Sequence, residues 1–166
     1  VNMNSVKNEQ HISYSQISTY IMCPLRYRFQ YIEELKPEFT PAALPFGGAI
    51  HESLAFFYRS LQNSGQRPSL EKLTEVFKND WNLRLECEDV KFDKGESSES
   101  LEQLGINMLY AFYENVTPGE VLCVEQPFCI RKLDPDNGRL LALPLVGYID
   151  LIEKDSTGNI VVVDHK

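Results

Sequence analysis

The sequence predicts an α/β fold in which a helical part comes before a sheet, an order of elements like that of α+β proteins. Apolar residues recur at helical spacing in several segments ahead of residue 116. From residue 120 onward, short runs rich in valine and isoleucine alternate with turn residues, which is typical of strands. We therefore expect four helices and then a three-stranded meander, in a single domain over residues 1–166, with the helical part over 1–119 and the core strands over 120–166.

The first helical stretch follows serines that can cap a helix. Ser13 and Ser15 are candidate N-caps for a short helix over 16–22. Pro24 interrupts this helix and suits the first turn of a new one, because its missing N–H would be unpaired there anyway. Three later prolines mark a loop: Pro37, Pro41 and Pro45.

Three longer helices are expected between this loop and the strands. The first of them begins near Gly47 and ends near Leu61, with apolar residues along one face. Ser69 is the expected N-cap of the next helix, and an acidic loop follows that helix. The last helix ends before Pro118.

Three strands are expected in the last part of the chain, over 121–133, 140–154 and 160–166. The first two are joined by a turn with Asn137-Gly138 at its centre. The second strand is apolar on both faces and therefore needs helices on both sides.

The composition indicates a globular protein with a local functional site. No apolar run approaches the roughly 18 residues that cross a bilayer, and the N-terminus lacks a secretory pattern, so we expect a cytoplasmic protein. Sixteen basic and 24 acidic residues give a net charge of −8, which disfavours nucleic-acid binding through bulk charge. The cysteines form no CxxC pair, which argues against a self-contained zinc site. We expect buried free thiols at Cys87, Cys123 and Cys129.

Two acidic residues interrupt the apolar pattern of the last two strands. Asp150 follows LVGYI, and Asp164 follows IVVV. A carboxylate in such a run is costly to desolvate unless it is paired or bound to a cation. Asp164 and Lys166 are two residues apart and share one face of a strand, which puts an ammonium beside the acids. The two acids together favour a site for a hard divalent cation over the ordinary alternatives. These are a strand end that emerges into solvent for Asp164 and Lys166, and a buried, hydrogen-bonded acid for Asp150.

Glu125 and His51 are further candidates, each with an ordinary alternative. Glu125 lies inside the first expected strand and could reach the same site, although a glutamate there more often faces solvent. His51 stands at the margin of an apolar helix face with Leu54 and Tyr58, where a histidine is usually structural. The small residues over 47–49 permit close approach of this helix to another element.

Four segments occur in the order found in the RecB-like branch of the PD-(D/E)XK nucleases: SYSQISTYIMCPLRYRFQY, FGGAIHESL, LVGYIDLI and VVVDHK. This branch includes the nuclease domains of RecB and AddB proteins and the CRISPR-associated RecB-like exonucleases. Each segment alone has low specificity, but all four in sequence are a strong signal. The resemblance covers nearly the whole chain, although residues 62–116 match only as generic helices.

The resemblance implies a restriction-endonuclease-like core and a function. The chain is expected to be a DNA nuclease that depends on Mg²⁺ or Mn²⁺, an exonuclease acting in DNA repair, recombination or defence. DNA is then the partner, and a helicase or another repair subunit is a further candidate partner. Hydrolysis would use a metal-activated water and no covalent enzyme intermediate.

The resemblance also implies a role for each matching residue. Asp150 would ligate or bridge the metal, Asp164 would be the acid of the signature, and Lys166 would position or activate the water. Glu125 resembles the upstream acid of many members. The implied metal ligands are His51, Asp150, Asp164 and the backbone carbonyl of His165.

The end of the chain and Cys23 qualify this expectation. Family members continue after the lysine with a helix that bears a glutamine motif and with another strand, so the C-terminal part of the fold is expected to be absent. We therefore expect little or no turnover from a chain that stops at Lys166. Cys23 stands where some relatives carry the first ligand of a [4Fe–4S] cluster, whose other cysteines follow the lysine. Only a longer chain could hold such a cluster.

A noncatalytic nucleic-acid-binding module on the same fold is the main alternative. Arg26, Tyr27 and Arg28 would then contribute to a basic and aromatic surface, with an amphipathic helix packed through its aromatics as the ordinary interpretation. An acidic protein-interaction domain is a second alternative, supported by the net charge of −8. The sequence leaves open the oligomeric state, the polarity and strand preference, and the choice between exonuclease and endonuclease action.

Overall fold

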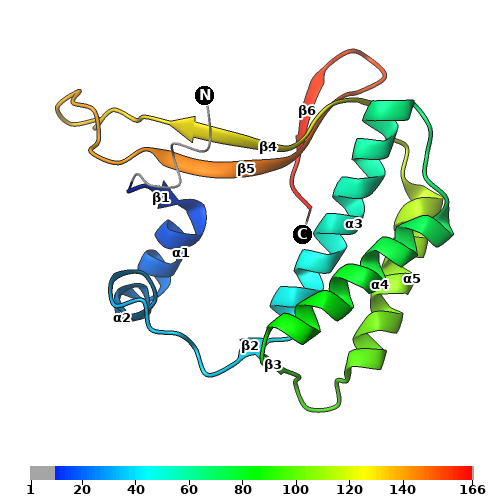
Figure 1. The fold of residues 1–166 in the computed structure, drawn as a ribbon. Helices are drawn as coiled ribbons and strands as arrows, with labels where there is room; N and C mark the ends of the chain where they lie inside the picture. The colour runs from blue at the N-terminus through cyan, green and yellow to red at the C-terminus, as the bar shows by residue number, and fades with distance from the viewer. Residues whose placement is uncertain (1–9, 166) are drawn as a thin grey trace. The chain divides into compact units, whose positions relative to one another are not determined.

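The computed structural model describes residues 10–165 and confirms a mixed α/β fold in which most helices precede the main strands (Figure 1). The helices are α1 (Tyr14–Met22), α2 (Pro24–Tyr27), the π-helical η2 (Arg28–Ile32), α3 (Ala43–Ser64), α4 (Leu70–Cys87) and α5 (Ser98–Asn115). The strands are β1 (Ile12–Ser13), β2 (Thr40–Pro41), β3 (Val90–Lys91), β4 (Glu120–Ile130), β5 (Leu145–Lys154) and β6 (Ile160–Val163).

The chain forms two compact units. The first unit combines Val1–Lys36 with Gln126–Ile149, and the second combines Pro37–Glu125 with Asp150–Lys166. The unit boundaries fall inside β4 and β5. The assignment of residues 1–166 to a single family domain stays a prediction.

In the first unit, the short strand β1 pairs in parallel with the start of β5, which adds a strand that the predicted meander lacks. Ser13 caps α1 as expected, and Gln16 completes the capping box by accepting a hydrogen bond from the Ser13 amide at 2.7 Å. The second strand begins later than expected, at Leu145. Pro144 directly precedes it, and proline has no N–H to donate to a strand partner.

In the second unit, α4 packs against both α3 and α5, as Figure 1 shows. α3 begins at Ala43, earlier than predicted, because Pro45 falls in its first turn, where no backbone N–H is required. Gly105 of α5 lies against the Phe77 ring, where a β-carbon would overlap the ring atoms. The side chains at the centre of this core are fully buried: Phe57, Leu73, Phe77, Trp81, Leu109 and Leu151.

In the second unit, the last residues of β5 lie beside β6. β6 pairs antiparallel with β5, with Leu151 opposite Val163. The predicted turn over 155–159 joins them. A second, two-stranded parallel sheet pairs β2 with β3 and was not predicted.

The prediction of buried thiols is wrong for two of the three cysteines. Cys87 and Cys129 are exposed, and Cys123 is partly buried. Cys87 is the last residue of α4, and Cys129 lies near the end of β4. Element ends expose side chains even where the neighbouring sequence is apolar.

Candidate metal centre

His51 projects from the first half of α3. The helix continues for more than three turns beyond it, and the buried residues Leu54, Phe57 and Tyr58 fix its position in the core. The side chain of His51 is 40% exposed, so the imidazole lies at the edge of the core. Its position on a rigid helix is the kind of support that a ligand needs.

Asp150 lies in β5, and the pairing of β5 with β6 fixes its position. Leu151, the next residue of β5, is fully buried opposite Val163 of β6. Since successive side chains of a strand point to opposite faces, this anchor turns Asp150 away from Leu151. The Asp150 side chain is only 14% exposed, and its Oδ2 accepts a hydrogen bond of 2.8 Å from the backbone amide of His165.

Glu125 occupies a strained backbone position in β4. Its φ angle is 51°, in the left-handed region that residues with a β-carbon rarely adopt. Such a conformation costs about 1–2 kcal/mol, and strained residues in strands gather at functional sites. Burial raises the pKa of the Glu125 carboxyl above its usual value, and the nearby charge of Asp150 raises it further.

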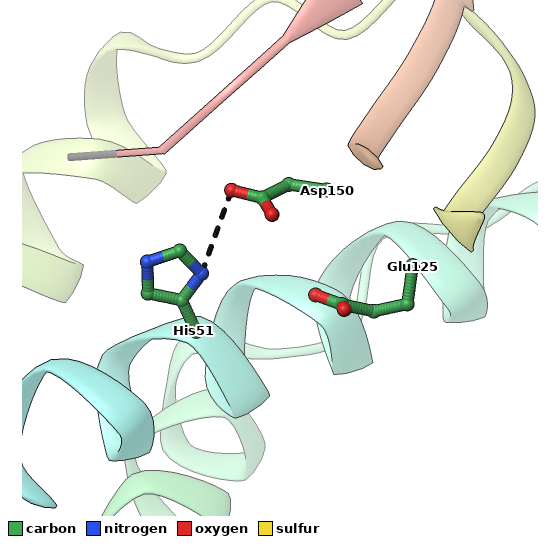
Figure 2. Close-up of side chains that lie close together, drawn as sticks. All are labelled: His51, Glu125 and Asp150. Carbon is green, nitrogen blue, oxygen red and sulfur yellow. Dashed lines mark ion pairs between the residues drawn. The ribbon is translucent and has the colours of Figure 1, made fainter. Parts of the chain in front are cut away.

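These three side chains converge from α3, β4 and β5, as Figure 2 shows. Each offers one ligand atom, and these atoms lie within 4.8 Å of one another. The closest pair is His51 Nδ1 and Asp150 Oδ2, 3.5 Å apart. We call His51, Glu125 and Asp150 the acid–histidine group.

The acid–histidine group fits a divalent cation. Two donors bound to one small ion at about 2.1 Å each lie at most roughly 4.2 Å apart, so small side-chain rotations would close the group around an ion. The two carboxylates are donors that suit Mg²⁺ and Mn²⁺, and the imidazole adds a nitrogen donor of the kind that transition metals bind. Burial, and then the nearby charge of Asp150, raise the pKa of Glu125, and a bound cation would offset both effects.

His165 and Tyr58 border the group as an aromatic pair. Their rings are stacked, with centroids 5.8 Å apart, and the His165 ring lies 6.3 Å from that of His51. Burial lowers the pKa of His165, which favours its neutral form. Burial also raises the pKa of Tyr58 to about 12, with a further contribution from Glu153. The contact of His165 with the group is through its amide nitrogen, and a metal-binding role for its carbonyl stays a prediction.

The remaining predicted residues of the signature lie at the end of the chain. Asp164 follows β6 directly and is exposed, and the acid–histidine group found among residues 10–165 does not include it. Lys166 lies outside the described residues. The catalytic roles of both stay predictions.

The predicted residues of the first unit have local structural contacts. The Cys23 Sγ accepts a hydrogen bond of 3.4 Å from the Arg26 amide and so caps α2. Arg28 forms an ion pair with Glu33 at 2.6 Å, and Arg26 and Arg28 are both exposed. The Tyr27 ring packs against Tyr20, with centroids 5.4 Å apart. These contacts fit the ordinary interpretation of an aromatic-packed helix, and the DNA-binding role stays a prediction.

A cavity of about 430 Å³ lies beside the group and was missed by sequence reasoning. His51 and His165 form part of its wall, together with α3 and α5. Its other lining residues are mostly apolar: Phe46, Gly47, Ile50, Leu54, Met108, Leu109 and Phe112. The helical spacing of these residues resembles that of an ordinary core face, so no sequence signal distinguished a cavity wall from a filled core.

Among residues 10–165, no helix is both long enough and apolar enough to span a membrane. No curated protein and no solved structure shows a significant match to the chain. A family model, described as the PD-(D/E)XK nuclease superfamily, matches residues 11–166, which is nearly the whole sequence. Members of this superfamily are metal-dependent nucleases, and the acid–histidine group offers the donors that such chemistry requires. The chain therefore belongs to the PD-(D/E)XK nuclease superfamily.

Proposed function

We propose that this protein hydrolyses phosphodiester bonds of DNA with a bound divalent cation, as a RecB-like exonuclease of DNA repair, recombination or defence. The observation that carries the proposal is the convergence of His51, Glu125 and Asp150 in a chain of this superfamily. These residues lie 25 to 99 positions apart in the sequence and come from a helix and two strands. The RecB-like branch is supported by the order of the four sequence segments that include His51 and Asp150.

The chain's own residues have distinct tasks in this proposal. His51 Nδ1 or Nε2 and one oxygen each from Glu125 and Asp150 hold the cation. The His165 amide orients the Asp150 carboxylate by donating to Oδ2, as supporting hydrogen bonds do at metal centres. When bound, the cation supplies Lewis acidity, which polarises a phosphoryl oxygen and lowers the pKa of water. Burial favours the neutral form of the His165 ring, which would not repel the cation.

The signature residues complete the proposal. Asp164 contributes a further carboxylate, the carbonyl of His165 a further oxygen ligand, and Lys166 the ammonium that positions the water and balances phosphate charge. Support for these roles comes from the D-H-K sequence at the end of an apolar strand. An imidazole ligand makes Mn²⁺ as suitable as Mg²⁺. We place the protein in the cytoplasm, with a helicase or another repair subunit as partner.

The test is a DNA cleavage assay with Mn²⁺ on the full-length protein, as distinct from a chain that stops at Lys166, and on two of its variants. Asp150→Asn retains the shape and the acceptor for the His165 amide but removes the charge, so we expect cleavage to be lost. Asp155→Asn removes a carboxylate five residues later, outside the acid–histidine group, and should leave cleavage intact. Equal cleavage by wild type and Asp150→Asn would contradict the proposal. Wild-type protein that binds DNA without cleaving it would support the noncatalytic module instead.

A further inference from the structure

Gly48 leaves room on α3 for the side chain of an arginine from α4. A β-carbon at this position would lie 2.6 Å from Arg84 Cζ and would also overlap Nη1. The guanidinium therefore rests against the α3 backbone, where alanine would exclude it. Glycine inside a helix makes the helix less stable than alanine does. Gly48 therefore gives Arg84 room at some cost in helix stability.

Arg84 is oriented by a carboxylate of its own helix. Its Nε lies 2.5 Å from Asp80 Oδ2, one turn earlier on α4. This pairing directs the terminal nitrogens Nη1 and Nη2 toward Gly48. The Arg84 side chain is 34% exposed, so solvent or a ligand reaches it.

Arg59 lies on the same face of α3 as Gly48. The two positions are 11 residues apart, which is close to three helical turns. Its Nη1 is 3.1 Å from Glu52 Oε1, which brings the guanidinium back along α3 toward His51. The side chain of Arg59 is 44% exposed.

We propose that Arg84 of α4 and Arg59 of α3 form a phosphate clamp, which binds DNA backbone phosphates on either side of the acid–histidine group. His51 lies three residues after Gly48 and eight before Arg59, so the clamp brackets it along the helix. Guanidinium groups bind phosphate oxygens through two parallel hydrogen bonds. A chain with a net charge of −8 needs such local cations to hold DNA. The clamp adds a DNA-binding role to the proposed function. The identification of its ligand as DNA rests on that function.

The clamp is tested by the salt dependence of DNA binding, measured on a single-stranded oligonucleotide in EDTA, where no metal-dependent cleavage occurs. Each lost phosphate contact should reduce the slope of log affinity against log salt by about 0.7 and weaken binding about fivefold at 0.1 M salt. We expect this result for Arg84→Gln and for Arg59→Gln. Lys78→Gln is the matched control, because Lys78 pairs with Glu102 and its loss changes the net charge equally.

A second variant separates the clamp from fold stability. Gly48→Ala retains every charge but displaces the Arg84 guanidinium, so it should weaken DNA binding as Arg84→Gln does. It should also raise the thermal midpoint by roughly 2–4 °C, because alanine stabilises the helix. Gly47→Ala is its control: no atom lies within 4 Å of a β-carbon there, so it should leave DNA affinity unchanged.

Three results would overturn the clamp: wild-type protein that does not bind the oligonucleotide, Gly48→Ala with full affinity and an unchanged slope, or Lys78→Gln with the same loss as the arginine variants. The proposed nuclease function fails separately. Absence of Mn²⁺-dependent cleavage by the full-length protein, as distinct from a chain that stops at Lys166, would contradict the nuclease function. Reduced salt slopes in the arginine variants would still support the clamp.

Discussion

Asp150 and Asp155 are five residues apart, yet their carboxylates lie in different surroundings. Asp155 lies in the turn after β5, where its Oδ1 accepts hydrogen bonds from the amides of Thr157 at 2.8 Å and Asn159 at 2.9 Å, and from the Thr157 hydroxyl at 2.7 Å. The Thr157 hydroxyl and the Asn159 amide are the main causes that lower the pKa of Asp155 to about 2. Asp150 instead lies beside Glu125, whose pKa it raises.

The surroundings of Asp155 fit a structural acid, and those of Asp150 fit the proposed role of a metal ligand. The charge of Asp155 is balanced by donors of its own turn, so the carboxylate has little to gain from a cation. Asp150 receives one amide hydrogen bond from His165 and shares its surroundings with a second acid and a histidine. Acids held together in this way are stabilised by a bound cation. The surroundings of each acid, rather than its position near the end of β5, decide its role.

The largest expected effect is loss of metal binding in Asp150→Asn. Removal of supporting residues around a metal typically costs 10–100-fold in affinity, so loss of a ligand charge should weaken Mn²⁺ binding by more than about 100-fold. Isothermal titration with Mn²⁺ measures it. Asp155→Asn is the matched control and should bind Mn²⁺ with wild-type affinity. A similar loss in both variants would remove the distinction between the two acids.

A second expected effect concerns the strained backbone of Glu125. Glycine adopts a φ of 51° without strain, so Glu125→Gly should stabilise the fold by about 1 kcal/mol while it weakens Mn²⁺ binding. Glu125→Gln should weaken Mn²⁺ binding without this gain, because it retains the β-carbon. Urea unfolding and Mn²⁺ titration of both variants measure the two quantities. A Glu125→Gly protein that is less stable than wild type would contradict the expected relief of backbone strain.

The smallest expected effect is a pH dependence of stability from Asp155. Its pKa lies at about 2 in the folded protein against an ordinary value of 3.8, so its ionised form is favoured by folding. The stabilisation is therefore present above about pH 4 and is lost as the pH falls through 2. Urea unfolding of wild type and Asp155→Asn from pH 5 to pH 2 should show a stability difference that shrinks toward the acid end. A stability difference that stays constant with pH would show that the substitution acts through something other than the charge of Asp155.

Much of the fold followed from local sequence patterns. Caps and turns were predicted where a single residue type decides the backbone, as at Ser13, Ser69 and the turn over 155–159. Pairing between distant segments was harder to predict. The parallel partner of β5 is two residues long, and so are β2 and β3, which is too short for an alternating pattern to be recognised.

The candidate site was predictable in part. Asp150 interrupts an apolar strand and His51 interrupts a helix face, so each stands out from its surroundings. The positive φ of Glu125 has no local signal, since left-handed positions usually carry glycine or asparagine. The room that Gly48 leaves for Arg84 depends on how α4 crosses α3, which no spacing along the chain reveals.

Anomalous scattering from a crystal of the protein soaked with Mn²⁺ would locate the cation relative to the two acids. We expect one strong peak in contact with the side chains of His51, Glu125 and Asp150, and none at Asp155. A well-occupied peak at the Asp155 turn, with none at the acid–histidine group, would contradict this expectation.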